Sequence, residues 1–249
     1  MRLLARIAVL GSILLMAACG LPPGSAADAA RLSNLRYRAL LVAGDGGVAA
    51  FDNATDAMRA RLTAARAVGV RQLTSSAKVS ERGGAGIASL DEVLSAIRDL
   101  RPEAGQGCLV FVTSHGSYRR GLVLMPSRNF LTPSALDPAL TAGCGDRPAI
   151  AILSGCFSGA FARGPMARAN RIVLTAARDD RPSFGCGAGF QYTFYDRCLL
   201  EAMDRAATWR EAHGLIRTCV ATRERALGFK PSEPQAWFGE GVSGMPVPR

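Results

Sequence analysis

The sequence predicts an α/β fold in which a mostly parallel central sheet lies between two layers of helices. Short, fully apolar runs such as residues 108–112 and 149–153 alternate with amphipathic stretches along the chain. This alternation is typical of parallel sheets that are covered on both faces. The chain has 249 residues, of which 49% are hydrophobic and only 20% charged, and this composition excludes a disordered protein.

The first part of the chain contains two expected strands and one helix. Residues 39–43 form an apolar run that ends in the loop-like sequence Gly-Asp-Gly-Gly, which indicates a buried strand. Asn53 or Thr55 is expected to cap a helix that continues to Val68. A weaker strand follows at residues 70–73, and the polar, Gly-rich residues 74–87 are expected to form a surface loop.

The middle of the chain repeats this alternation. Ser89 is expected to cap a helix that places its apolar residues, up to Leu100, on one face. Residues 108–112 predict a buried strand, and residues 121–131 a small hairpin. Thr132 is expected to cap the next helix, because a proline follows it at the first helical position.

The last part of the chain is predicted to contain two more strands and two helices. Residues 149–153 and 172–176 are apolar runs of strand length. Helices are expected at about 190–206 and 208–227, and residues 236–238 resemble a short strand. No repeat or break in composition indicates a second domain, so residues 36–249 are expected to form one domain.

The N-terminus has the pattern of an export signal. Two arginines precede an apolar run at residues 7–16, which is shorter than the roughly 20 residues that span a bilayer. Residues 15–19, Leu-Met-Ala-Ala-Cys, resemble a bacterial lipobox, which implies cleavage before Cys19 and a lipid on its thiol. An ordinary secretory signal or an uncleaved anchor is the alternative.

Residues 1–18 are therefore expected to be a lipoprotein signal, and residues 19–35 a lipidated, flexible tether. By resemblance to enterobacterial lipoproteins, the glycine after Cys19 favours the outer membrane. We expect the protein to be anchored in the bacterial envelope and to face the periplasm. Removing the signal and its two arginines lowers the formal net charge from +10 to +8.

Two apolar runs end, within three residues, at side chains suited to nucleophilic chemistry. His115, followed by Gly116, comes after residues 108–112, and Cys156 comes after residues 149–153. Parallel sheets bind ligands at the carboxyl ends of their strands. The Cys156 thiol and the His115 imidazole are therefore expected to face each other across a cleft. The amides of Gly116 and Cys156 could then hold an oxyanion. The alternative is a buried core cysteine and a histidine that caps a loop.

The remaining composition limits other functions. With only two histidines in the chain, a His-rich metal site is excluded, and neither a metal nor a cofactor is expected. His213 is expected to serve helix packing. Apart from Cys19 and Cys156 there are five cysteines, which allow up to two disulfides of undetermined pairing. Aromatic residues are only 6% and the arginines are dispersed, so nucleic acid is not expected as a partner.

Three segments carry a resemblance to a known family. Residues 108–117, CLVFVTSHGS, and 149–159, AIAILSGCFSG, resemble the His-Gly and Cys blocks of peptidase family C13, the legumain family. Residues 175–186 are similar to its substrate-pocket loop. The resemblance covers roughly residues 36–200 and implies a caspase-like fold and a cysteine endopeptidase acting on peptides or proteins. Cys156 would be the nucleophile, and His115 would activate the scissile bond and protonate the leaving amine.

The chain also departs from this family. Legumains carry an arginine where this chain has Asp52, and an acidic residue where it has Ser154-Gly155. Ser183 and Asp196 align with pocket residues, so Asp52, Ser183 and Asp196 are expected to bind the substrate. Two carboxylates in the pocket suggest a basic side chain at P1, the residue before the scissile bond.

Two other functions stay open at this level. Members resembling glycosylphosphatidylinositol transamidase pass the acyl group to an amine, so the same His115–Cys156 dyad could serve a transamidase or transpeptidase. A non-enzymatic envelope binding protein that kept the fold is the third alternative. The sequence does not indicate the oligomeric state.

Overall fold

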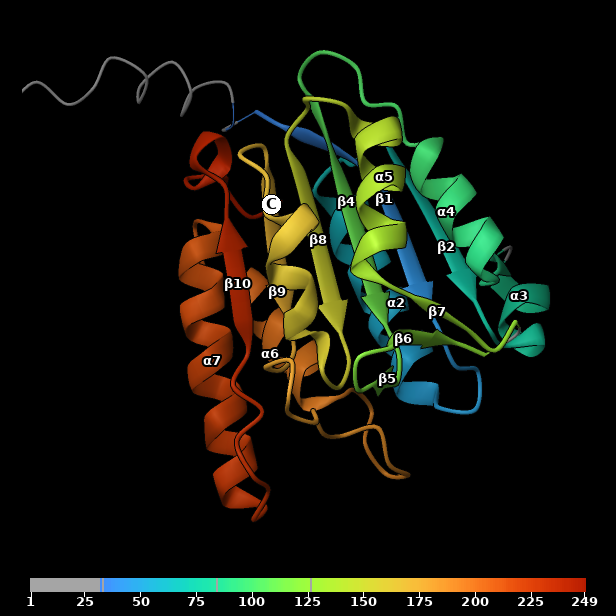
Figure 1. Ribbon diagram of the computed structural model, residues 1–249, viewed down its shortest axis with the longest axis vertical. Helices are drawn as coiled ribbons and strands as arrows, with labels where there is room; N and C mark the ends of the chain where they lie inside the picture. The colour runs from blue at the N-terminus through green and yellow to red at the C-terminus, as the bar shows by residue number, and fades with distance from the viewer. Residues whose placement is uncertain (1–31, 33, 84, 126) are drawn as a thin grey trace, which may run out of the picture.

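The computed structural model describes residues 32, 34–83, 85–125 and 127–249, and it contains a seven-stranded sheet between two layers of helices (Figure 1). The strand order is β10-β9-β8-β4-β1-β2-β3, and all neighbours are parallel except the antiparallel pair β10–β9. The predicted three-layer α/β architecture is therefore confirmed. The strands are β1 (Arg36–Ala43), β2 (Gly69–Thr74), β3 (Gly86–Ile87), β4 (Gln106–Thr113), β8 (Ala149–Ser154), β9 (Arg171–Thr175) and β10 (Gln235–Phe238).

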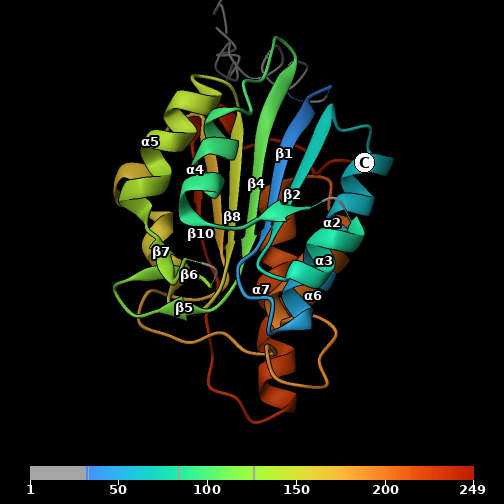
Figure 2. The same ribbon diagram turned by 90° about the vertical axis from the view of Figure 1, so that its right-hand side faces the viewer.

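Helices cover both faces of this sheet (Figure 2). One face carries α2 (Ala49–Ala64), α6 (Phe194–Met203) and α7 (Trp209–Ala226), and the other carries α4 (Leu90–Arg98) and α5 (Pro133–Cys144) with the 3₁₀ turns η1 (Ser158–Ala162) and η2 (Gly164–Met166). Strand β4 shows why its sequence is apolar throughout. Leu109 and Phe111 enter one core, whereas Val110 and Val112 enter the other.

Several predicted helix starts and strands are confirmed. The Ser89 hydroxyl accepts a hydrogen bond from the Glu92 amide at the start of α4, and Thr132 caps α5 in the same way through Ala135. The predicted hairpin is present as β6 (Gly121–Leu124) and β7 (Asn129–Leu131). Strand β5 (Gly116–Ser117), which the sequence did not predict, joins them in a separate three-stranded sheet.

The predicted start and end of the first helix were both wrong. Helix α2 starts at Ala49 after a turn in which the Gly47 amide donates to Asp45 Oδ1. Asn53 is not its cap, and its side chain donates to the Gln191 carbonyl instead. The helix ends before Val68 because Arg66 adopts a left-handed backbone conformation, with φ 56°.

The loop prediction for residues 74–87 was also wrong, because this segment forms the short helix α3 (Ala77–Gly83) and strand β3. The Ser76 hydroxyl accepts from the Val79 amide and so caps α3. Helix α3 was not predicted because its seven residues are too few for a clear apolar period.

The helix predicted from residue 190 starts at Phe194, where the Thr193 hydroxyl caps it.

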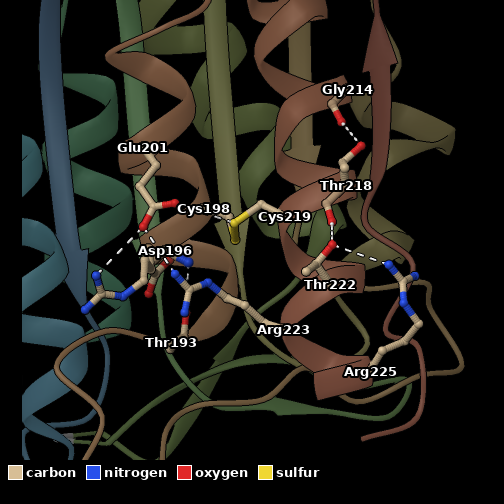
Figure 3. The surroundings of a disulfide bond; sticks show 11 residues. Thr193, Asp196, Cys198, Glu201, Gly214, Thr218, Cys219, Thr222, Arg223 and Arg225 are labelled. Carbon is tan, nitrogen blue, oxygen red and sulfur yellow. Dashed lines mark hydrogen bonds and ion pairs between the residues drawn. A yellow bond between two sulfur atoms is a disulfide. The ribbon is translucent and has the colours of Figure 1, made fainter. Parts of the chain in front are cut away.

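Two disulfides are present among the described residues, one between the central sheet and a helix and one between two helices of the same layer. Cys108–Cys144 joins β4 to α5, and Cys198–Cys219 joins α6 to α7 (Figure 3). Beside the second bridge, Glu201 on α6 pairs with Arg223 on α7 at 3.2 Å. Among the described residues, this leaves Cys156 and Cys186 as free thiols.

The predicted signal at residues 1–18, the lipidation site Cys19 and nearly all of the tether at residues 19–35 lie outside the described residues. Within the part of the chain that the structure describes, no helix is both long and apolar enough to cross a membrane.

Candidate active site

The site lies at the carboxyl edge of the central sheet, where three neighbouring strands end beside one another. The ladder β1–β4–β8 continues one residue past the strands, since the Gly44 amide donates to the Thr113 carbonyl and the Ser114 amide to the Ser154 carbonyl. The next residues along the chain are Asp45, His115, and Gly155 with Cys156. In Figure 1 this edge is at the bottom, next to the sheet β5-β6-β7.

The structure brings the two predicted catalytic side chains to one narrow cleft. His115 and Cys156 both line it, and the His115 side chain is 40% exposed. The other lining residues come from the strand ends, from α2 and from the loop that leads into α6; they are Phe51, Ser114, Ser154, Gly155, Ser183, Phe184, Cys186 and Thr193. The imidazole is also held by the ring of Phe51, which meets it edge to face at 5.4 Å between centroids.

Ser183 contacts the sulfur of Cys156 directly. Its backbone amide donates to Cys156 Sγ at 3.3 Å, and its hydroxyl lies 3.8 Å from the same sulfur. The Cys156 thiol in turn donates to the Ser183 carbonyl oxygen at 3.4 Å, so the backbone of Ser183 fixes the position of the sulfur. Of the three residues predicted to bind substrate, Ser183 is the one that the structure places in the cleft.

The chain turns sharply after Cys156. Phe157 has a left-handed backbone with φ 59°, and only the five-residue 3₁₀ turn η1 follows. A short 3₁₀ turn, and not an α-helix, therefore follows the cysteine. Gly159 makes the turn possible, because a Cβ there would lie 2.6 Å from the Asp179 amide nitrogen.

The Gly116 amide is directed away from its own small sheet. Gly116 pairs with Leu122 in β6, and the Val123 amide donates to the His115 carbonyl, so Gly116 and Leu122 form a non-hydrogen-bonded pair. Its N–H therefore points away from β6. On the Cys156 side the two backbones are in contact, since a Cβ at Gly116 would lie 1.8 Å from the Cys156 carbonyl oxygen. The backbone of Gly116 therefore packs directly against that of Cys156.

Asp45 also lies at this site, which the sequence analysis did not predict. Its Oδ2 lies 3.6 Å from His115 Nε2, its side chain is mostly buried, and the Gly47 amide donates to its Oδ1 at 2.8 Å. The carboxylate is thus fixed beside the imidazole. A signal was present: Asp45 follows an apolar strand at the same spacing as His115, two residues after its end.

Asp52 and Asp196, the other predicted substrate-binding residues, are not in the cleft lining. Asp52 is 5% exposed and accepts from the Thr74 hydroxyl at 2.6 Å, and Asp196 is fully buried and accepts from Thr113 at 2.7 Å. Burial raises the pKa of both carboxyls, which favours the neutral acids. The structure therefore does not bring these two carboxyls together with Ser183 as a negatively charged pocket.

Cys186 is a second thiol in the cleft. Burial, and next the nearby Cys156, raise the pKa of Cys186 above its ordinary value, so it stays a thiol when other thiols ionise. His213 lies on α7, outside the cleft lining, and packs against the Phe238 ring at 6.0 Å. Burial lowers its pKa to about 4, so His213 is neutral at pH 7.

Two comparisons with known proteins bear on this site. The model of the Peptidase C13 family matches residues 99–245, more than half of the chain, and this span contains His115, Cys156 and Ser183. No curated protein matches the chain.

In the part of the chain that the structure describes, no group of three or more His, Cys, Asp or Glu side chains is arranged to hold a metal ion.

Proposed function

Because the chain belongs to the peptidase C13 family, we propose that it is a cysteine endopeptidase in which Cys156 is the nucleophile and His115 its proton-transfer partner. One observation carries this proposal. His115 and Cys156 follow the neighbouring strands β4 and β8 and line the same cleft at the carboxyl edge of a parallel sheet. A thiol and an imidazole at such an edge are suited to acyl transfer.

The proposed reaction runs through an acyl-enzyme. His115 takes the proton of the Cys156 thiol, and the resulting thiolate attacks the scissile carbonyl carbon while the amides of Gly116 and Cys156 donate to the oxyanion. His115 then protonates the leaving amine as the C–N bond breaks, and a thioester remains on Cys156. Water attacks the thioester with help from His115, which releases the acid and the free thiol.

A peptide carrying a thiol-reactive group tests the nucleophile. At pH 7 we expect the probe to label Cys156 in wild type and in Cys186→Ser, but not in Cys156→Ala. Because the pKa of Cys186 is raised, labelling of Cys186 is expected to appear only as the pH becomes alkaline. Mass spectrometry of the labelled peptides measures both sites. Labelling of Cys156→Ala at pH 7 equal to that of wild type contradicts the assignment.

We also propose that Asp45 positions His115 in this reaction. The Asp45 carboxylate is held by the Gly47 amide and lies 3.6 Å from His115 Nε2, so it orients the imidazole ring. Asp45→Asn is expected to lower kcat about 10- to 100-fold while KM changes little, because ground-state binding of the peptide is unaffected. Steady-state kinetics on a cleaved peptide measure the two constants.

The matched control is Asp99→Asn, an exposed carboxylate at the end of α4, which should change neither constant. Asp45→Glu should recover part of the lost kcat, which a purely structural role of Asp45 does not predict. A rise in KM at constant kcat in Asp45→Asn would contradict the positioning role.

We further propose that the protein is a lipoprotein of the bacterial envelope, anchored through Cys19 and facing the periplasm. The lipobox-like sequence before Cys19 suggests this location. The disulfides Cys108–Cys144 and Cys198–Cys219 support it, since such bonds form and persist in oxidising compartments.

A further inference from the structure

A second cavity adjoins the nucleophile on the side of the β5–β6 turn. It has a volume of about 400 Å³, and none of the residues that line the catalytic cleft line it. The two sites are nevertheless contiguous along the chain. Phe157, in its wall, follows Cys156, and Ser117, also in its wall, follows Gly116. Because Phe157 and Ser117 directly follow Cys156 and Gly116, the cavity lies within reach of a peptide whose scissile bond is at Cys156.

The cavity carries excess positive charge. Arg119, Arg120 and Arg163 line it, against the single carboxylate of Asp179. Arg163 is paired with Asp179. Among the described residues, Arg119 and Arg120 pair with no carboxylate; instead their guanidinium groups lie over aromatic rings, Arg119 over Tyr118 at 5.0 Å and Arg120 over Phe130 at 4.1 Å. Both guanidinium groups thus keep their hydrogen-bond donors for a ligand.

The walls of the cavity are aromatic and held in unusual backbone conformations. Tyr118 is 50% exposed, and its ring meets that of Phe157 edge to face at 5.6 Å. Arg119 and Phe157 both have left-handed backbones, with φ 60° and 59°. Such conformations are uncommon for residues other than glycine and concentrate at functional sites. The turn therefore presents an arginine pair beside an aromatic surface.

We propose that this cavity is a substrate subsite that binds a carboxylate, so that the enzyme prefers peptides with Asp or Glu within two residues of the scissile bond. The inference rests on the proposed peptidase function, because it takes the chain at Cys156 to be a peptide. Guanidinium groups bind carboxylates through paired, charge-assisted hydrogen bonds. The rings of Tyr118 and Phe157 would cover the methylene groups of the acidic side chain.

Binding to the inactive Cys156→Ala variant tests the subsite without requiring turnover. A fluorescently labelled peptide series places one Glu, or one Gln, at each position from three residues before to three residues after the scissile bond. Fluorescence anisotropy is expected to show about tenfold tighter binding of Glu than of Gln at one position, which corresponds to about 1.4 kcal/mol. Adding Arg119→Gln and Arg120→Gln should abolish this difference, with the affinity for the Glu peptide falling more than that for the Gln peptide.

Arg66→Gln is the matched control, because Arg66 is exposed and also left-handed, with φ 56°, but does not line the cavity. It should keep the full preference for Glu. The preference should also weaken as salt is raised from about 0.05 to 0.5 M, since exposed charges are then screened. Equal binding of Glu and Gln peptides at every position, or a preference that survives loss of both arginines, overturns the proposal.

Two further outcomes are informative. Peptides with free and amidated C-termini separate the sources of the carboxylate, and a preference seen only with the free C-terminus overturns an acidic side chain as the ligand. Failure of the peptidase function is distinguishable from failure of the subsite. In the first case wild type cleaves none of the series, whatever it binds; in the second it cleaves Glu and Gln peptides with equal kcat/KM.

Discussion

Cys156→Ala is expected to lower the turnover of any peptide that wild type cleaves by at least about 10³-fold, because the covalent pathway is lost with its nucleophile. The sulfur sits at the end of β8 and receives the Ser183 amide, and no other thiol in the described residues is placed in this way. Peptide binding should be retained. A fluorogenic peptide found in a library screen measures the rate.

Cys186→Ser is the control for this loss. Cys186 lines the same cleft, but its raised pKa keeps it protonated, so the variant should retain most of the activity. Turnover by Cys156→Ala above about a tenth of wild type would remove Cys156 from the mechanism.

Adding amine acceptors to the wild-type reaction separates hydrolysis from transfer, because a transamidase would form the amide product at the expense of the acid.

Gly116→Ala is expected to reduce kcat/KM about 10²- to 10³-fold, the usual effect of losing an oxyanion donor. The added methyl group would lie 1.8 Å from the Cys156 carbonyl oxygen, a contact that the two backbones relieve only by moving apart. That movement withdraws the Gly116 N–H from the substrate and displaces the nucleophile. Kinetics together with probe labelling of Cys156 measure the effect.

Gly214→Ala is the matched control for a glycine substitution. Gly214 lies in α7, where an added Cβ meets nothing within 4 Å, so activity should be unchanged. Its stability should rise by up to about 1 kcal/mol, because alanine is the better helix former. Normal kinetics in Gly116→Ala would show that the β5 backbone does not take part in catalysis.

The sequence was sufficient to predict that His115 and Cys156 share one cleft because of how parallel sheets are built. Each inner strand is buried on both faces and is therefore apolar throughout, so its end is easy to locate. His115 and Cys156 directly follow such strands, and consecutive strands of this kind tend to be neighbours. The caps Ser89 and Thr132 were predictable for a similar reason, since each acts on amides only three residues away.

The remaining site residues depend on contacts that sequence spacing does not encode. Asp45 meets His115 only because β1 lies next to β4 in the sheet, 70 residues apart along the chain. Asp52 and Asp196 were placed in the pocket by family resemblance, but threonines at the ends of β2 and β4 bind their carboxyls in the interior. The disulfide pairing likewise depends on which helix crosses which strand.

The two edges of the central sheet separate the start of the described domain from the cleft. Strand β1 enters the sheet at Arg36, at the edge opposite the cleft, and the Tyr37 hydroxyl there lies 3.4 Å from the Pro246 carbonyl near the other end of the chain. Eight residues of strand span roughly 25 Å. With the proposed lipid on Cys19, the flexible tether would join the domain at this edge, about one strand length away from the cleft. Its attachment would then not compete with the substrate for the catalytic edge.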